Sequence, residues 1–164
     1  MLKFINSFYI TVLGILIGAV LVLGTMVAPT IFHTEPLIGS VLSHYQAGVV
    51  MSSIFSKFGY FLNGMILIVI VYEINLAYQK RKIKPYDLLV TIILIGSMSF
   101  FTFYLMPSIL ELQALKETTT EQFNSLHKLS EFDFKVILAS AFMMIFLRLS
   151  KFEENNILIC KLKK

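Results

Sequence analysis

Ionisable side chains with helical spacing follow residue 120 and suit a polar site. His127, Glu131 and Lys135 stand four residues apart, so they share one face of a helix. Ionisable groups at membrane depth are costly and usually face a bundle interior or a water-filled cavity. We therefore interpret the three as a candidate polar site, with Lys57 as a partner for Glu131 or Asp133. The alternative stays open that this helix projects above the bilayer and that the face is solvated.

A second set of side chains suits metal or haem chemistry. The candidate ligands are His33, His44, His127, Met26 and Met106. Imidazole and thioether together select copper(I), whereas haem ligation needs two facing histidines, for which His33 and His127 are the candidates. Methionine in an apolar helix is ordinarily a packing residue, and no H-x-x-x-H or C-x-x-C spacing occurs. The sequence therefore requires no cofactor and leaves copper and haem as hypotheses.

Motifs of hydrolytic enzymes are missing from the sequence. It contains no G-x-S-x-G, no Walker sequence and no H-E-x-x-H. Glu73 is the one carboxylate inside an apolar stretch, and we expect it to pair with Lys80 or Arg81 rather than to relay protons. These features favour a protein without enzymatic activity.

The composition indicates that the elements positioning these residues lie in lipid. Of 164 residues, 57% are hydrophobic and only 15% are charged, and the mean hydropathy is +0.79. Soluble domains carry about 25% charged residues, and one small core has no room for so much apolar surface. With the single cysteine Cys160, the chain has no internal disulfide. The sequence predicts an integral membrane protein bound to the lipid bilayer.

Apolar runs of sufficient length predict four membrane spans in a single domain, 1–164. A span needs about 20 residues, and the expected spans are 8–32, 58–78, 88–106 and 130–149. The last contains only 12 charge-free residues, 136–147, so it must extend back through Glu131, Asp133 and Lys135. We predict an all-α four-helix bundle.

The stretch from Leu37 to Phe55 differs from the apolar spans because polar residues alternate with apolar ones. Its apolar residues recur at helical spacing between polar ones such as Ser40, His44 and Gln46. This pattern indicates an amphipathic helical segment that lies at the interface or extends the second span outward. Pro36 suits its first turn. A plain connector is the remaining alternative.

Lysine and arginine predict the orientation of the chain. With four spans, one side of the membrane collects Lys3, Lys80, Arg81, Lys82, Lys84, Arg148, Lys151, Lys161, Lys163 and Lys164, and the other side Lys57, Lys116, Lys128 and Lys135. The richer side is cytoplasmic by the positive-inside rule. Both termini are therefore expected in the cytoplasm of a bacterial cell, with the chain in its inner membrane. The net charge of +4 follows from this orientation, and no nucleic-acid partner is needed.

Small residues in the first span predict close helix packing. Gly14 and Gly18 form a G-x-x-x-G pair, which lets backbones approach in lipid. We expect that face to pack on a neighbouring helix of the same chain, with self-association into a homo-oligomer as the alternative. Pro29 interrupts the backbone hydrogen bonds at the end of the same span.

Several short motifs resemble a known family. They are Val27-Ala28-Pro29-Thr30-Ile31-Phe32, the segment Gly48 to Phe55, the pair Met106-Pro107, and the F-x-x-L-H-x-x-S order of Phe123, Leu126, His127 and Ser130. The chain thereby resembles the transmembrane-protein-205-like family from about residue 10 to 149. The family often has a neutral residue where this chain has Asp133.

The resemblance implies a four-helix integral membrane protein whose activity is not established, with a eukaryotic relative associated with resistance to a platinum drug. From sequence we expect a non-enzymatic membrane protein that handles a small solute or metal or supports a membrane-protein partner. The alternative is a haem- or metal-dependent membrane oxidoreductase that uses His33 and His127.

Overall fold

The chain is helical in a computed structural model that describes residues 2–34, 39, 42–79, 84–116, 118 and 120–162. The elements are α1 (Leu2–Val22), the π-helical turn η1 (Leu23–Val27), α2 (Ala28–Phe32), α4 (His44–Tyr78), α5 (Pro85–Phe100), the π-helical turn η2 (Phe101–Leu105), α6 (Met106–Ala114) and α7 (Glu121–Leu162). No strand occurs within the described residues. The expected all-α class is confirmed.

Three helical stretches of the described chain are long and apolar enough to cross a membrane. They are Phe4–Phe32, Tyr45–Tyr78 and Pro85–Ala114, and they contain the first three expected spans. The fourth expected span, 130–149, lies within α7, which is not one of the three. Membrane association therefore rests on three helices, and a fourth crossing stays a prediction.

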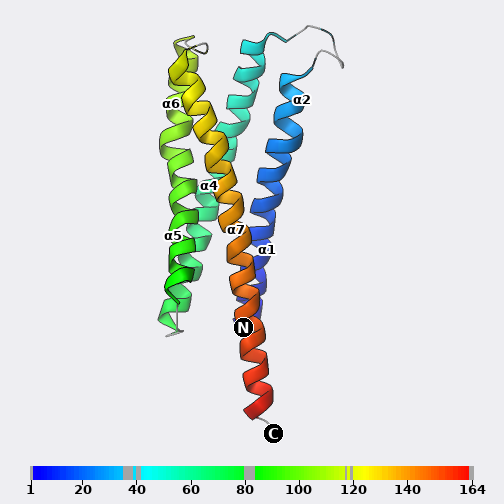
Figure 1. The fold of residues 1–164 in the computed structure, drawn as a ribbon, viewed down its shortest axis with the longest axis vertical. Coiled ribbons are helices and arrows are strands. Elements are labelled where there is room, and N and C mark those ends of the chain that lie inside the picture. Colours follow the sequence, from blue (N-terminus) through cyan, green and yellow to red (C-terminus); the bar gives the residue numbers. More distant parts are fainter. Residues whose placement is uncertain are drawn as a thin grey trace.

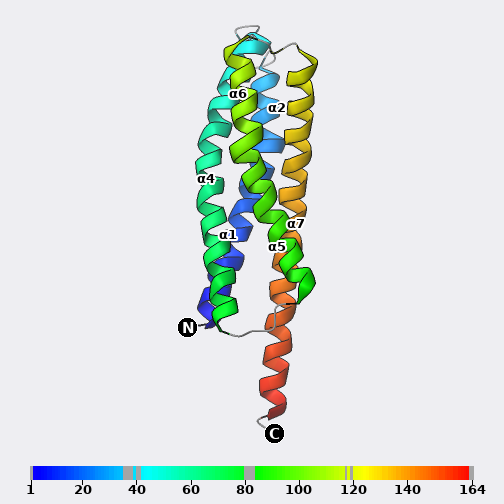
Figure 2. The same ribbon diagram turned by 90° about the vertical axis from the view of Figure 1, so that its left-hand side faces the viewer.

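The long helices run side by side in a bundle (Figures 1 and 2). We call the end where α2 finishes and α4 begins the His33 end, and the end where α1 begins the Arg148 end. α7 continues beyond the bundle at the Arg148 end. With 42 residues at about 1.5 Å per residue, it is much longer than a hydrocarbon core of about 30 Å. Part of α7 must therefore project from any membrane it crosses.

The core lies along the bundle axis and is almost entirely apolar. Residues without exposed surface recur one turn apart on each helix; they include Leu13 and Leu16 of α1, Leu62 of α4, Leu94 and Met98 of α5, and Ile137, Ala141 and Met144 of α7. Large apolar side chains such as Leu67, Ile92 and Phe146 are exposed on the outside. Since lipid accommodates such side chains as water does not, this arrangement fits a bundle in a bilayer.

Two prolines explain the two π-helical turns, η1 between α1 and α2 and η2 between α5 and α6. Each turn ends two residues before a proline, Pro29 after η1 and Pro107 after η2. A proline ring clashes with the carbonyl four residues earlier, which belongs to Thr25 or Phe103 and lies inside the π-helical turn. Hydrogen bonds over five residues, such as Ala28 N–H to Leu23 O, relieve this conflict.

The helix α4 begins earlier than the second expected span, 58–78. Ser43 caps α4 in a capping box with Gln46, and the helix then continues without a break from His44 to Tyr78. Residues 44–55 therefore extend this helix outward, which was one of the three alternatives for the 37–55 segment. Its residues 37, 38, 40 and 41, like Pro36 before them, lie outside the described residues.

The expected intramolecular packing of the G-x-x-x-G face is wrong. Gly14 and Gly18 are exposed, and a Cβ atom added to either would meet nothing within 4 Å. α1 instead turns Leu13, Leu16 and Val20 towards the bundle. Since the glycines lie on the opposite side of the helix from the core, self-association stays as the alternative for this face.

Candidate functional site

The elements α1, η1 and α2 follow one another without a break, and we call them together the first rod. A cavity of about 500 Å³ lies at the His33 end, between the first rod, α4 and α7. α1 contributes Val20 and Leu21, η1 contributes Leu23, Gly24 and Thr25, and α2 contributes Ala28, Pro29 and Phe32. We call it the larger cavity. Half of the V-A-P-T-I-F motif thus lies in one wall. Neither η1 nor α2 has a buried residue, so this wall is packed loosely.

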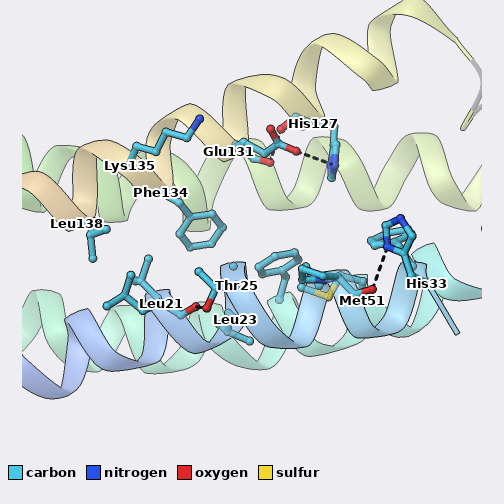
Figure 3. A pocket seen from close by; sticks show the side chains of 17 residues that line it. Leu21, Leu23, Thr25, His33, Met51, His127, Glu131, Phe134, Lys135 and Leu138 are labelled. Atoms are coloured by element: carbon cyan, nitrogen blue, oxygen red, sulfur yellow. Dashed lines mark hydrogen bonds and ion pairs between the residues drawn. The ribbon is translucent and has the colours of Figure 1, made fainter. Parts of the chain in front are cut away.

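The opposite wall comes from α7 and is apolar at depth. Phe134 and Leu138 point from α7 towards the first rod (Figure 3). Phe134 also contacts the aromatic rings of α4 and η2, with centroids 5.4 Å from Phe55 and 4.6 Å from Phe101. This aromatic cluster joins the cavity wall to the buried core. The deep part of the larger cavity therefore suits an apolar group.

Three of the four residues of the expected polar site line the larger cavity. They are His127, Glu131 and Lys135. His127 Nε2 lies 3.4 Å from Glu131 Oε1, and the protein leaves 44% and 59% of these side chains exposed. Lys135 extends away from the first rod (Figure 3). The charged groups thus lie at the rim rather than in the depth of the cavity.

Lys57 does not join this group. It is exposed on α4, lines neither described cavity, and forms no ion pair with Glu131 or Asp133 in the described part of the chain. Asp133 turns instead into the bundle, where it is 5% exposed and interacts with Ser97 of α5. The expected partnership with Lys57 is therefore wrong.

Two expected haem ligands lie on opposite walls at the same end of the larger cavity, His33 on the first rod and His127 on α7 (Figure 3). Both imidazoles already interact with their own helices. His33 Nδ1 lies 3.1 Å from Pro29 O, and His127 Nε2 contacts Glu131. The cavity therefore brings the pair to one end, with one nitrogen of each imidazole engaged by its own helix.

The remaining expected metal ligands are scattered. Met26 is 63% exposed and lines neither cavity, whereas Met106 is buried and lines, with His127, the second cavity described below. The side chain of His44 lies outside the described residues. No group of three or more His, Cys, Asp or Glu side chains that could hold a metal ion occurs in the described part of the chain.

A second cavity of about 230 Å³ adjoins the first, between α2, α4, α6 and α7. We call it the smaller cavity. Five residues line both: Phe32, Met51, Phe55, His127 and Ser130. The smaller cavity alone contains the polar side chains of Ser52, Gln113, Thr118 and Asn124. Sequence reasoning missed it because its walls come from segments far apart in the chain.

The Arg148 end contains a buried polar cluster. Arg148 Nη2 donates to Glu73 Oε1, and the guanidinium carbon lies 5.4 Å from the ring centroid of Tyr72. Arg148 is 3% exposed and Glu73 is 15% exposed. Glu73 therefore pairs with a residue 75 positions later. Lys80 and Arg81, the partners expected from the sequence, lie outside the described residues.

Tyrosines extend this cluster to α1. The rings of Tyr9 and Tyr72 stack with centroids 3.7 Å apart and planes 2° apart. The Tyr72 hydroxyl donates to Asn6 Oδ1 over 3.0 Å. α1, α4 and α7 are thereby connected through polar and aromatic side chains. Sequence reasoning missed the contact between Glu73 and Arg148, and their opposite charges at the ends of two apolar stretches are the signal that could have found it.

Comparison with known proteins places most of the chain in one family model. Residues 11–118 match a domain of unknown function, DUF4149. The matched region includes the whole first wall of the larger cavity and ends before α7. No curated protein and no solved structure matches the chain.

Proposed function

Since the chain belongs to the DUF4149 family, whose activity is unknown, we propose its function from the larger cavity: it is a multi-pass membrane protein that binds a small amphiphilic molecule there. The observation that carries this proposal is a cavity of about 500 Å³ with apolar depth and polar rim. Ligand pockets typically measure about 300–1,000 Å³ and combine apolar walls with a few polar groups.

The surroundings of the cavity favour a ligand from the bilayer. Leu21, Gly24 and Pro29 line it and are also exposed at the outer surface of the first rod, which is apolar and fits lipid. An apolar molecule dissolved in the membrane therefore has a short path into the cavity. Polar side chains at one end of the cavity can hydrogen-bond a polar group of the ligand; they belong to His127, Ser130 and Glu131.

Our proposal includes a specific topology. α7 is the fourth crossing, both termini are cytoplasmic, and the membrane is the bacterial inner membrane. The lysine and arginine distribution supports this orientation, and the burial of Arg148 within the bundle supports a crossing by α7. In this orientation the His33 end and both cavities face the periplasmic leaflet.

Tryptophan fluorescence tests ligand binding, because the chain contains no tryptophan. Phe134→Trp places a reporter in the cavity wall, and Leu67→Trp places a matched reporter at an exposed position, 63% accessible, outside both cavities. Each variant is reconstituted in lipid nanodiscs and titrated with a brominated dodecyl amphiphile. We expect saturable quenching at 134 and a linear, non-saturating response at 67. Identical linear responses at both positions would overturn the proposal.

A haem-dependent oxidoreductase is the second candidate, favoured by the shared cavity of His33 and His127. His33 Nδ1 is taken by Pro29 O and His127 Nε2 by Glu131, so His33 Nε2 and His127 Nδ1 are the nitrogens that would ligate iron. Purified protein with a Soret band that disappears in His33→Ala and in His127→Ala would support it. A colourless preparation would exclude it.

A further inference from the structure

We infer that the smaller cavity is the head-group subsite for the proposed amphiphile, and that it accepts an uncharged hydrogen-bonding group such as a hydroxyl, a carbonyl or an amide. This inference rests on the proposed function, since it assigns the polar part of the same ligand. The apolar chain of the ligand occupies the larger cavity.

Shared walls make the two cavities parts of one site. Met51 and Phe55 of α4 and His127 and Ser130 of α7 line both. A molecule whose chain contacts Phe134 in the larger cavity therefore meets these residues before it reaches the smaller one. The imidazole of His127 lies at the junction, because it lines both cavities.

Buried polar side chains give the smaller cavity its chemistry. Gln113 of α6 is 6% exposed and Ser52 of α4 is 8% exposed, and both line the cavity. Gly48 of α4 lies against this amide, since a Cβ atom there would be 3.4 Å from Gln113 Nε2, at van der Waals contact. An amide and a hydroxyl both donate and accept hydrogen bonds. They therefore complement a neutral polar group.

Charge argues against an ionic head group. Among the described residues that line the smaller cavity there is no Asp, Glu, Lys or Arg. The larger cavity has one carboxylate, Glu131, and one ammonium, Lys135, so its formal charge with neutral histidines is zero. An ion buried without a counter-charge loses far more hydration than it regains. A phosphate or a quaternary ammonium is therefore disfavoured, whereas a neutral head group is accepted.

The experiment compares three amphiphiles with the same brominated dodecyl chain and different head groups, an alcohol, a phosphate and a quaternary ammonium. Quenching of the Phe134→Trp reporter in nanodiscs gives an affinity for each. We expect the alcohol to bind at least tenfold more tightly than either ion. Gln113→Leu should reduce the preference for the alcohol to less than threefold. Ser52→Ala, which changes the shape of the cavity less, should also reduce this preference.

The matched control is Asn63→Leu, which removes an amide from α4 outside both cavities and should leave the preference unchanged. Equal affinities for the three head groups, or a preference that survives both Gln113→Leu and Ser52→Ala, would overturn the subsite while leaving the amphiphile site intact. Absence of saturable quenching by every probe would overturn the proposed function and the subsite together.

Discussion

The two ends of the bundle use polar residues in opposite ways. At the Arg148 end, Arg148 and Glu73 bind each other, and Tyr9 stacks on Tyr72. At the His33 end, the helices separate around two cavities, and His127 and Glu131 stay half exposed at the rim. Both ends are built from the same antiparallel helices, and they differ in how closely the helices pack and in what the polar side chains bind.

This difference separates residues that stabilise the bundle from residues that are available for a ligand. A buried charge whose partner is another side chain contributes to helix association and leaves little capacity for a third molecule. Polar groups that line a cavity retain that capacity. Ionisable residues in a membrane protein are therefore informative about function only after their partners are known.

The largest effect is expected from breaking the ion pair at the Arg148 end. Glu73→Leu leaves the Arg148 guanidinium buried without its carboxylate, which should cost about 3–5 kcal/mol of unfolding free energy. The double variant Glu73→Leu/Arg148→Leu should recover most of this loss, because neither charge is then buried alone. Thermal and denaturant unfolding in detergent micelles measure both. A single variant as stable as the parent would contradict the structural role of this end.

Filling the larger cavity should have the next largest effect, this time on binding. Ala28→Phe adds a ring to the cavity wall and should weaken binding of the brominated amphiphile by at least tenfold in the Phe134→Trp background. The control Ala139→Phe makes the same change at an exposed position of α7 outside both cavities and should leave the affinity unchanged. Equal affinities in the two variants would show that the probe binds elsewhere.

Glu131→Gln should produce a smaller effect that distinguishes the rim from the buried pair. Exposed ion pairs contribute about 0–1 kcal/mol, so the unfolding free energy should change far less than in Glu73→Leu. The amphiphile affinity should change by about threefold or less, because Glu131 lies at the rim and the proposed head group is neutral. A stability loss as large as that of Glu73→Leu would remove the contrast between the two ends.

The smallest effect on the stability of the single chain is expected at the glycines of α1. Because a Cβ atom at Gly14 or Gly18 meets nothing within 4 Å, Gly18→Leu should unfold at the parent's temperature or slightly above it. Analytical ultracentrifugation in detergent checks the self-association alternative. A parent dimer that becomes monomeric in Gly18→Leu would assign this face to an interface between copies, and a clear loss of monomer stability would contradict its exposure.

Much of the fold followed from the sequence because lipid imposes simple rules. The hydropathy pattern predicted the all-α class and the first three spans, now seen at 4–32, 45–78 and 85–114. The spacing of His127, Glu131 and Lys135 correctly predicted a shared face, since i to i+4 spacing is local to one helix. Pro29 predicted interrupted hydrogen bonding at the end of the first span, which the structure realises as the π-helical turn η1. The corresponding turn η2 before Pro107 was not predicted.

Contacts between helices were harder to predict from the sequence. The spacing of Gly14 and Gly18 indicated a packing face but not which helix packs there, and α1 turns this face away from the bundle. Glu73 was assigned to nearby cations, whereas its partner Arg148 comes from another helix. Helical periodicity defines a face of one helix, and the rotation of helices about their axes depends on packing across the whole bundle. The cavities arise from that rotation, so no local motif predicted them.

Photolabelling tests the central claim most directly. An alkyl probe that carries a diazirine is equilibrated with the protein in nanodiscs, irradiated, and located by mass spectrometry of the labelled peptides. We predict saturable labelling at Met51, Phe55 and Phe134, with competition by unlabelled amphiphile. Labelling confined to exposed residues such as Tyr60 and Leu67, without competition, would contradict a ligand site at the His33 end.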